Sequence, residues 1–172
     1  MAALTVPALA IAALLVLAGA QKVLDPTMTD GALRALRIPS SKALVRVGAA
    51  AEALLGAAAI TVGGAVLWGL VAVSYLAFAA FVTAALRKGT MIGSCGCFGR
   101  EETPPHWSHV ALNVVLAAIA VIATSLDRAV LDELADHPGA AVGAAVTAGV
   151  AVYLLYAAFV VLPRTLAVAT DR

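Results

Sequence analysis

The two cysteines of the chain stand two residues apart in the glycine-rich stretch GSCGCFGR. Gly96 lies between Cys95 and Cys97 and allows the backbone to bend enough for the two sulfurs to approach. A disulfide across this spacing closes a very small ring, so we expect it to be strained, easily reduced and active in thiol–disulfide exchange. We therefore predict that Cys95 and Cys97 are a catalytic redox pair and that Gly96, Phe98 and Gly99 shape the loop that holds them.

Charged residues on both sides of this stretch bear on the reactivity of the thiols. Arg87, Lys88 and Arg100 favour the thiolate, which is the nucleophile in exchange. Residues 103–105, Thr-Pro-Pro, resemble a helix cap and first turn, which would direct the positive end of the next helix at the loop, whereas the acidic residues 101–102 act in the opposite sense. The alternative interpretation is a pair of inert small side chains in a tight turn.

A polar stripe follows in the next helical segment. His106, His109 and Asn113 are spaced three and four residues apart, so they share one face of a helix. Because thiol oxidation releases protons, a histidine that titrates near neutrality is a candidate acceptor. The alternative is that the histidines are interfacial residues and that Asn113 makes a hydrogen bond between helices.

The cysteines and histidines also allow a metal-binding interpretation. Cys95, Cys97, His106 and His109 offer the sulfur and nitrogen ligands that zinc or copper accepts. Neither spacing is that of the usual zinc finger. We therefore predict no metal site and keep a zinc- or copper-binding membrane protein as the second alternative function.

Glu52 is the one acidic residue deep within an apolar segment. It lies about 15 Å into its predicted helix, close to the middle of the membrane, where a carboxylate is costly unless it is paired or protonated. We expect it to face the bundle interior, with Arg46, His109 and Asn113 as candidate partners, and we predict that Glu52, His109 and Asn113 form a proton relay. The structural alternative is a protonated side chain that hydrogen-bonds across helices.

The composition places these residues in a membrane protein. Of 172 residues, 63% are hydrophobic and 12% are charged, about half the charged share of an average soluble domain. The net charge of +1 does not indicate a nucleic-acid partner. Apolar stretches long enough to cross a lipid bilayer predict an all-α polytopic transmembrane bundle, with helices over residues 1–21, a hairpin over 43–86 that turns at Gly63-Gly64, and helices over 107–126 and 139–162. A cleaved signal peptide is the alternative for the first segment.

The basic residues are unevenly distributed between the two sides of this bundle. If the five helices alternate, Arg128 lies on one side and the remainder of the 11 basic residues lie on the other: Lys22, Arg34, Arg37, Lys42, Arg46, Arg87, Lys88, Arg100, Arg164 and Arg172. The positive-inside rule makes the basic side cytoplasmic. We therefore predict an external N-terminus, a cytoplasmic C-terminus and a cytoplasmic cysteine loop in the cell membrane.

A short helix is predicted between the first two membrane segments. Asp30 is a candidate cap for it, Leu33 and Leu36 lie on one side, and Arg34 and Arg37 lie beside them. We expect this helix to lie along the lipid headgroups, where the arginines meet anionic lipid. A solvated basic loop is the alternative.

Small residues recur along the membrane segments, for example Gly48, Ala49, Gly56 and Gly63. In lipid the association of helices depends on close van der Waals contact, which small side chains permit. We therefore expect these four residues at helix contacts.

The chain resembles the methylamine utilisation protein MauE family, within the wider DoxX-like group of small four-helix membrane proteins. The resemblance is carried by AGAQKVLDP at residues 18–26, by EALLG at 52–56 and above all by SCGCFG at 94–99. It covers residues 1–126, which we interpret as the MauE/DoxX-like four-helix membrane domain. Residues 127–172 would then add an external acidic loop, a fifth transmembrane helix and a short tail.

The resemblance implies a membrane thiol–disulfide redox or maturation protein. Its implied role is to support disulfide formation in the small subunit of methylamine dehydrogenase, alongside a thioredoxin-like partner, with Cys95 and Cys97 as the redox pair. A quinone is a candidate electron acceptor for such a protein, although no residue of the sequence indicates one. That maturation takes place outside the cytoplasm, whereas the charge distribution places the cysteines inside. The first alternative function is a non-catalytic membrane scaffold or assembly factor.

Overall fold

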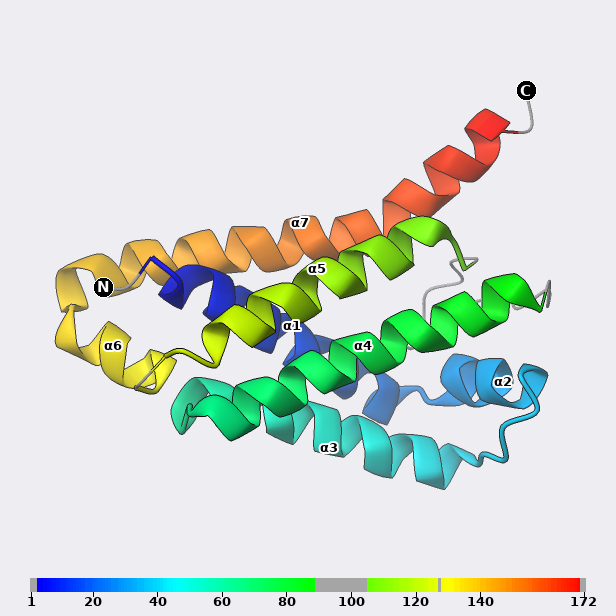
Figure 1. Cartoon of the computed structure of the whole chain (residues 1–172), viewed down its shortest axis with the longest axis horizontal. Helices are drawn as coiled ribbons and strands as arrows, with labels where there is room; N and C mark the ends of the chain where they lie inside the picture. Colours follow the sequence, from blue (N-terminus) through cyan, green and yellow to red (C-terminus); the bar gives the residue numbers. More distant parts are fainter. Residues whose placement is uncertain (1–2, 89–104, 127, 171–172) are drawn as a thin grey trace.

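The chain folds into a bundle of helices (Figure 1). This computed structural model describes residues 3–88, 105–126 and 128–170, with side chains up to residue 161. Within these ranges no strand is present, which confirms the predicted all-α class. The described helices are α1 (Thr5–Leu24), α2 (Thr27–Ala35), α3 (Lys42–Thr61), α4 (Ala65–Arg87), α5 (Trp107–Ala123), α6 (Val130–Asp136) and α7 (Pro138–Thr170).

Most of the long helices suit a membrane by length and composition. Among the described residues, α1, α3, α4 and the segment Pro138–Val161 of α7 are each long and apolar enough to cross a bilayer. α5 is equally apolar but has 17 residues, which correspond to about 26 Å of helix and to the lower limit for a span. These helices overlap the five predicted segments and confirm a polytopic membrane bundle, although α7 continues to Thr170, beyond the predicted end at residue 162.

The bundle is built around α1, which packs against α3, α5 and α7. Ile11, Leu14 and Leu15 of α1 are almost fully buried in a core that also contains Trp68 of α4 and Leu116 of α5. Large apolar side chains elsewhere point outward, as expected where the solvent is lipid rather than water.

The contact between α1 and α3 depends on two glycines. A Cβ atom added at Gly19 would lie 2.6 Å from the carbonyl oxygen of Ala49, and one added at Gly56 would lie 2.6 Å from that of Ala12. No real side chain tolerates such distances, so the two backbones approach this closely because neither residue has a Cβ. The expectation that Ala49 and Gly56 lie at a helix contact is confirmed.

Two other predicted glycine positions have different outcomes. Gly63 and Gly64 form the turn between α3 and α4 with φ angles of +70° and +92°, a region that favours glycine, so the predicted turn is confirmed. Gly63 also contacts the segment before α6, because an added Cβ would lie 2.9 Å from the Cα of Ala129. The expectation for Gly48 is wrong: an added Cβ there would have no described atom within 4 Å.

The predicted short helix is α2, but Asp30 is not its cap. α2 begins at Thr27, four residues earlier than a cap at Asp30 would give, and Asp30 lies in its first turn. The reason lies in the preceding residues, because the Asp25 carboxylate accepts a hydrogen bond from the backbone N–H of Thr27 at 3.1 Å. Asp30 is thereby free to bond elsewhere.

The end of α2 is a Schellman motif. The backbone N–H of Ile38 donates to the carbonyl of Leu33, and that of Arg37 donates to the carbonyl of Arg34. Arg37 occupies the left-handed position of the motif, with φ of +62°. The chain therefore reverses after α2 and runs back toward α3.

The helices of the bundle alternate in direction, which gives it two ends (Figure 1). At one end of the bundle, α1 and α4 finish and α3 and α5 begin. This end also contains α2, so we call it the α2 end. We call the opposite end the α6 end. Lys22, Lys42 and Arg87 are at the α2 end, whereas Arg128 is at the α6 end. The predicted segregation of these charges is thus present in the fold, and the assignment of the α2 end to the cytoplasm stays a prediction.

Candidate functional site

The predicted redox loop lies outside the described residues, so the roles of its members stay predictions: Cys95, Gly96, Cys97, Phe98 and Gly99. The helices that it connects are described. α4 ends and α5 begins at the α2 end of the bundle (Figure 1). At the end of α4, the ammonium group of Lys88 donates a hydrogen bond to the carbonyl of Leu36 at 3.1 Å, which links α4 to the end of α2.

Glu52 faces the interior, as predicted, and its partner is Lys22 of α1. The Lys22 side chain is buried, with 4% of its surface exposed, and its ammonium group forms an ion pair with Oε2 of Glu52. It also lies 4.5 Å from the centre of the Phe78 ring, within range of a cation–π interaction. A lysine near the end of a membrane helix usually extends toward the headgroups, so this inward orientation is unusual.

Arg46, one of the partners considered for Glu52, bonds elsewhere. Its Nε donates to the backbone carbonyl of Val23 at the end of α1, at 3.3 Å. Lys22 therefore supplies the positive charge beside Glu52 for which Arg46 was a candidate. The signal for Lys22 was present, because it is a basic residue within the helix that precedes the one containing Glu52.

A pocket of about 290 Å³ adjoins this ion pair among α1, α2, α3 and α4. Its polar groups come from Lys22, Glu52 and Thr29, and most of its wall is apolar. The apolar wall is formed by Leu33, Leu44, Val45, Gly48, Ala49, Ala77, Phe78 and Phe81. An apolar chamber with a few convergent polar groups is the usual character of a small-molecule site.

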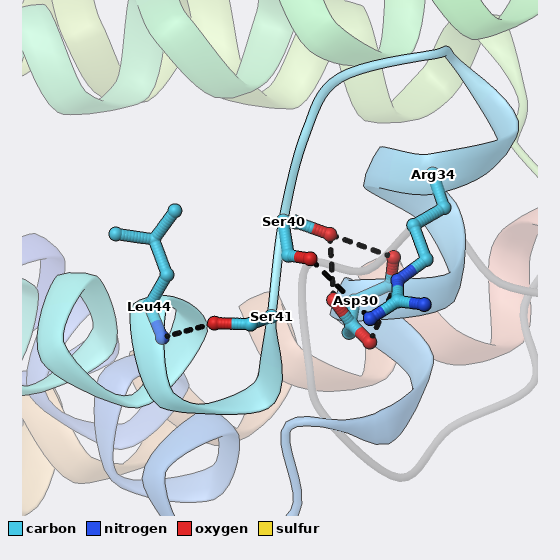
Figure 2. Close-up of polar contacts among 5 residues, drawn as sticks. All are labelled: Asp30, Arg34, Ser40, Ser41 and Leu44. Carbon is cyan, nitrogen blue, oxygen red and sulfur yellow. Dashed lines mark hydrogen bonds and ion pairs between the residues drawn. The ribbon is translucent and has the colours of Figure 1, made fainter.

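One side of the pocket is contributed by α2, which polar contacts tie to the start of α3 (Figure 2). The Ser40 hydroxyl donates to Oδ1 of Asp30 at 2.6 Å, and Arg34 forms an ion pair with Oδ2 of the same carboxylate at 3.1 Å. Arg34 also donates to the carbonyl of Ser40 at 3.3 Å. The neighbouring Ser41 caps α3, because its hydroxyl accepts from the backbone N–H of Leu44.

These contacts favour the charged form of Asp30. The hydrogen bond from Ser40 lowers the pKa of the Asp30 carboxyl below its ordinary value, and Arg34 acts in the same direction, while burial opposes both. The tie between α2 and α3 therefore depends on an ionised Asp30.

His109 is fully buried at the start of α5. Its Nδ1 accepts a hydrogen bond from the backbone N–H of His106 at 3.2 Å, and its Nε2 lies 3.0 Å from the carbonyl oxygen of Phe159 in α7. Since a carbonyl can only accept, Nε2 carries the proton, and the two bonds together require the neutral ring. For His109 to take up a proton at Nδ1, the contact with the His106 amide must first break.

Asn113 lies on the same buried side of α5 as His109. Its amide donates to the carbonyl of His109 at 2.8 Å, which is a bond within the helix rather than between helices. Asn113 also lines a small cavity of about 20 Å³ that it shares with Phe78. Phe78 thus borders both this cavity and the pocket of Glu52, and the proton relay through Glu52, His109 and Asn113 stays a prediction.

The predicted first residue of this membrane segment, Trp107, is confirmed, but the predicted cap and first turn of α5 are wrong. The helix begins at Trp107 with His106 as its N-cap, and the His106 ring accepts from the backbone N–H of Ser108 at 3.1 Å. Pro105 precedes the helix instead of forming its first turn. His106 displaces the expected cap because its ring and that of His109 together satisfy the first amides of the helix.

The metal interpretation receives no support from the described part of the chain. Those residues contain no cluster of three or more histidine, cysteine, aspartate or glutamate side chains that could hold a metal ion. Cys95 and Cys97 lie outside them, so the mixed sulfur and nitrogen site is not tested.

The comparisons with known proteins address the family. Neither the curated proteins nor the solved structures contain a match for the chain. The family model described as methylamine utilisation protein MauE matches residues 1–126, which include α1 to α5 and end before α6. The chain therefore belongs to the methylamine utilisation protein MauE family.

Proposed function

We propose that this MauE-family protein is a membrane thiol–disulfide oxidoreductase in which Cys95 and Cys97 cycle between dithiol and disulfide. The observation that carries the proposal is the motif SCGCFG, which lies within the part of the chain that matches the family. A glycine-hinged cysteine pair suits exchange better than structure, because a strained disulfide is readily reduced.

The partner in this proposal is a thiol protein of the thioredoxin type, and the final recipient of the disulfide is the small subunit of methylamine dehydrogenase. Membership of a methylamine utilisation family supports this assignment. The excess of basic residues at the α2 end favours a cytoplasmic position for the cysteines. Maturation outside the cytoplasm would require the opposite, so the side of the membrane is part of the proposal that needs a test.

Oxidation of the dithiol releases two protons, which need an acceptor. Glu52 is the better placed of the candidate carriers, because it lies on a pocket with Lys22, whereas His109 must first release the His106 amide. We assign Asn113 a positioning role, since it bonds to the His109 carbonyl.

The test is replacement of both cysteines by serine in the cell that uses the protein. We expect Cys95→Ser/Cys97→Ser to abolish both the mixed disulfide with the partner and the ability to replace the wild-type gene. A double serine variant that supports methylamine dehydrogenase maturation as well as wild type would contradict the redox role and favour a scaffold. The control is Gly69→Ala in α4, because an added Cβ at this position has no described atom within 4 Å.

A further inference from the structure

We propose that the pocket beside Lys22 and Glu52 binds a membrane quinone through its ring, with the apolar tail of the quinone extending into lipid. This inference rests on the proposed redox function for its physiological purpose, but the site consists entirely of described residues.

The polar groups of the pocket match the two oxidation states of a quinone. The Lys22 ammonium is a hydrogen-bond donor for a quinone carbonyl, and the Glu52 carboxylate is an acceptor for a quinol hydroxyl. Oε2 of Glu52 is buried and makes no hydrogen bond in the described part of the chain beyond its ion pair with Lys22. Lys22 and Glu52 thus place a donor and an acceptor side by side in the lining of one mostly apolar pocket.

The walls suit a flat ring with an apolar tail. Phe78 and Phe81 supply aromatic surface, and Leu33 and Leu44 supply aliphatic surface. The volume of about 290 Å³ is at the small end of the range for ligand pockets, which fits a single ring rather than a whole long-tailed lipid. A lipid acyl chain would match the apolar walls but has no polar group that could bond to Lys22 or Glu52.

The ligand also balances the proposed chemistry. When the dithiol becomes a disulfide, two S–H bonds break, one S–S bond forms, and two electrons and two protons leave. A quinone takes up two electrons and two protons as its two C=O groups become O–H groups. Lys22 and Glu52 are positioned to bond with those oxygens in both forms.

Gly48 provides a variant that fills the pocket without disturbing the packing. It lines the pocket, and a Cβ there would meet no described atom within 4 Å. Gly69 of α4 offers the same open surroundings but does not line the pocket, so Gly69→Leu is the matched control for Gly48→Leu. Both changes replace glycine by a better helix former, so neither should unfold its helix.

The experiment is a calorimetric titration of the full-length protein in detergent with a benzoquinone that carries a ten-carbon tail. We expect saturable binding by wild type and by Gly69→Leu, and binding weakened by about tenfold or more in Gly48→Leu. Lys22→Met/Glu52→Gln, which removes both charges together, should weaken binding to a similar degree. Equal binding by wild type and Gly48→Leu, or equal binding of decylbenzene and the quinone, would overturn the inference.

The same titration separates this inference from the proposed function. Cys95→Ser/Cys97→Ser should bind the quinone as wild type does, because binding requires no thiol. Absence of quinone binding by wild type would overturn the inference even if the cysteines prove to be redox-active. Binding by a protein whose cysteines prove dispensable would uphold the site and reject the redox cycle.

Discussion

The two ends of the bundle hold charged pairs in opposite ways. At the α2 end, the side chains of Lys22 and Glu52 are 4% and 21% exposed, whereas at the α6 end those of Arg128 and Asp136 are 55% and 51% exposed. A buried pair needs both members, because a single charge is costly in a medium of low dielectric constant, while water screens an exposed pair. Apolar residues would stabilise the buried position at least as well, so the pair at the α2 end indicates a function.

Loss of one member of the buried pair should have the largest effect. Lys22→Met leaves the Glu52 carboxylate without its partner in the bundle interior. We expect this to lower the free energy of unfolding by about 3–5 kcal/mol, measured by thermal unfolding in detergent.

The double variant Lys22→Met/Glu52→Gln is the control for this effect, since it removes both charges. We expect it to recover most of the lost stability. A double variant as unstable as the single one would show that Lys22 acts through packing, for example on Phe78, and would break the contrast between the two ends.

A smaller effect is expected where Asp30 ties α2 to α3. Because the pKa of Asp30 is lowered in the folded protein, its contribution is fully present above its ordinary pKa and is lost as the pH falls through the folded value. We expect the protection of the α2 amides against hydrogen exchange, relative to the intrinsic rate at the same pH, to fall below about pH 4 in wild type. In Asp30→Asn we expect it to be low at every pH. Slow exchange of α2 in Asp30→Asn at neutral pH would contradict this account.

The smallest effect is expected at the α6 end. Asp136 raises the pKa of the Arg128 guanidinium, chiefly through its hydrogen bond, so Arg128 remains charged, but the pair is exposed to solvent. We expect Arg128→Ala to leave the thermal unfolding temperature unchanged within measurement error. A loss as large as that of Lys22→Met would remove the distinction between the ends.

The helices were predictable because the cost of charge in lipid restricts charged residues to their ends. The turn at Gly63-Gly64 and the contact at Gly56 followed from the same reasoning, since glycine permits a positive φ and close approach. The surroundings of Gly48 could not be predicted in this way, because a glycine at a helix contact and a glycine beside an empty space look the same in the sequence. Their difference depends on which neighbour faces each one.

The candidate site was predictable in part. The depth of Glu52 indicated an inward side chain in need of a partner, but the identity of that partner depends on which helices adjoin, and α1 rather than α5 supplies it. The cap of α5 could not be predicted from the usual capping residues, because a pair of histidine rings satisfies the first amides instead. The pocket arises from four helices together and has no local sequence signature.

The most direct test of the redox account is the state of Cys95 and Cys97 in intact cells. Cells would be labelled with membrane-permeant and membrane-impermeant maleimides, before and after reduction, and the protein weighed. We predict a fraction of molecules that gains two permeant labels after reduction but none before it, and no gain from the impermeant reagent in intact cells. Cysteines that stay unreactive under both conditions, or that are fully reduced in every molecule even after treatment with an oxidant, would contradict the account.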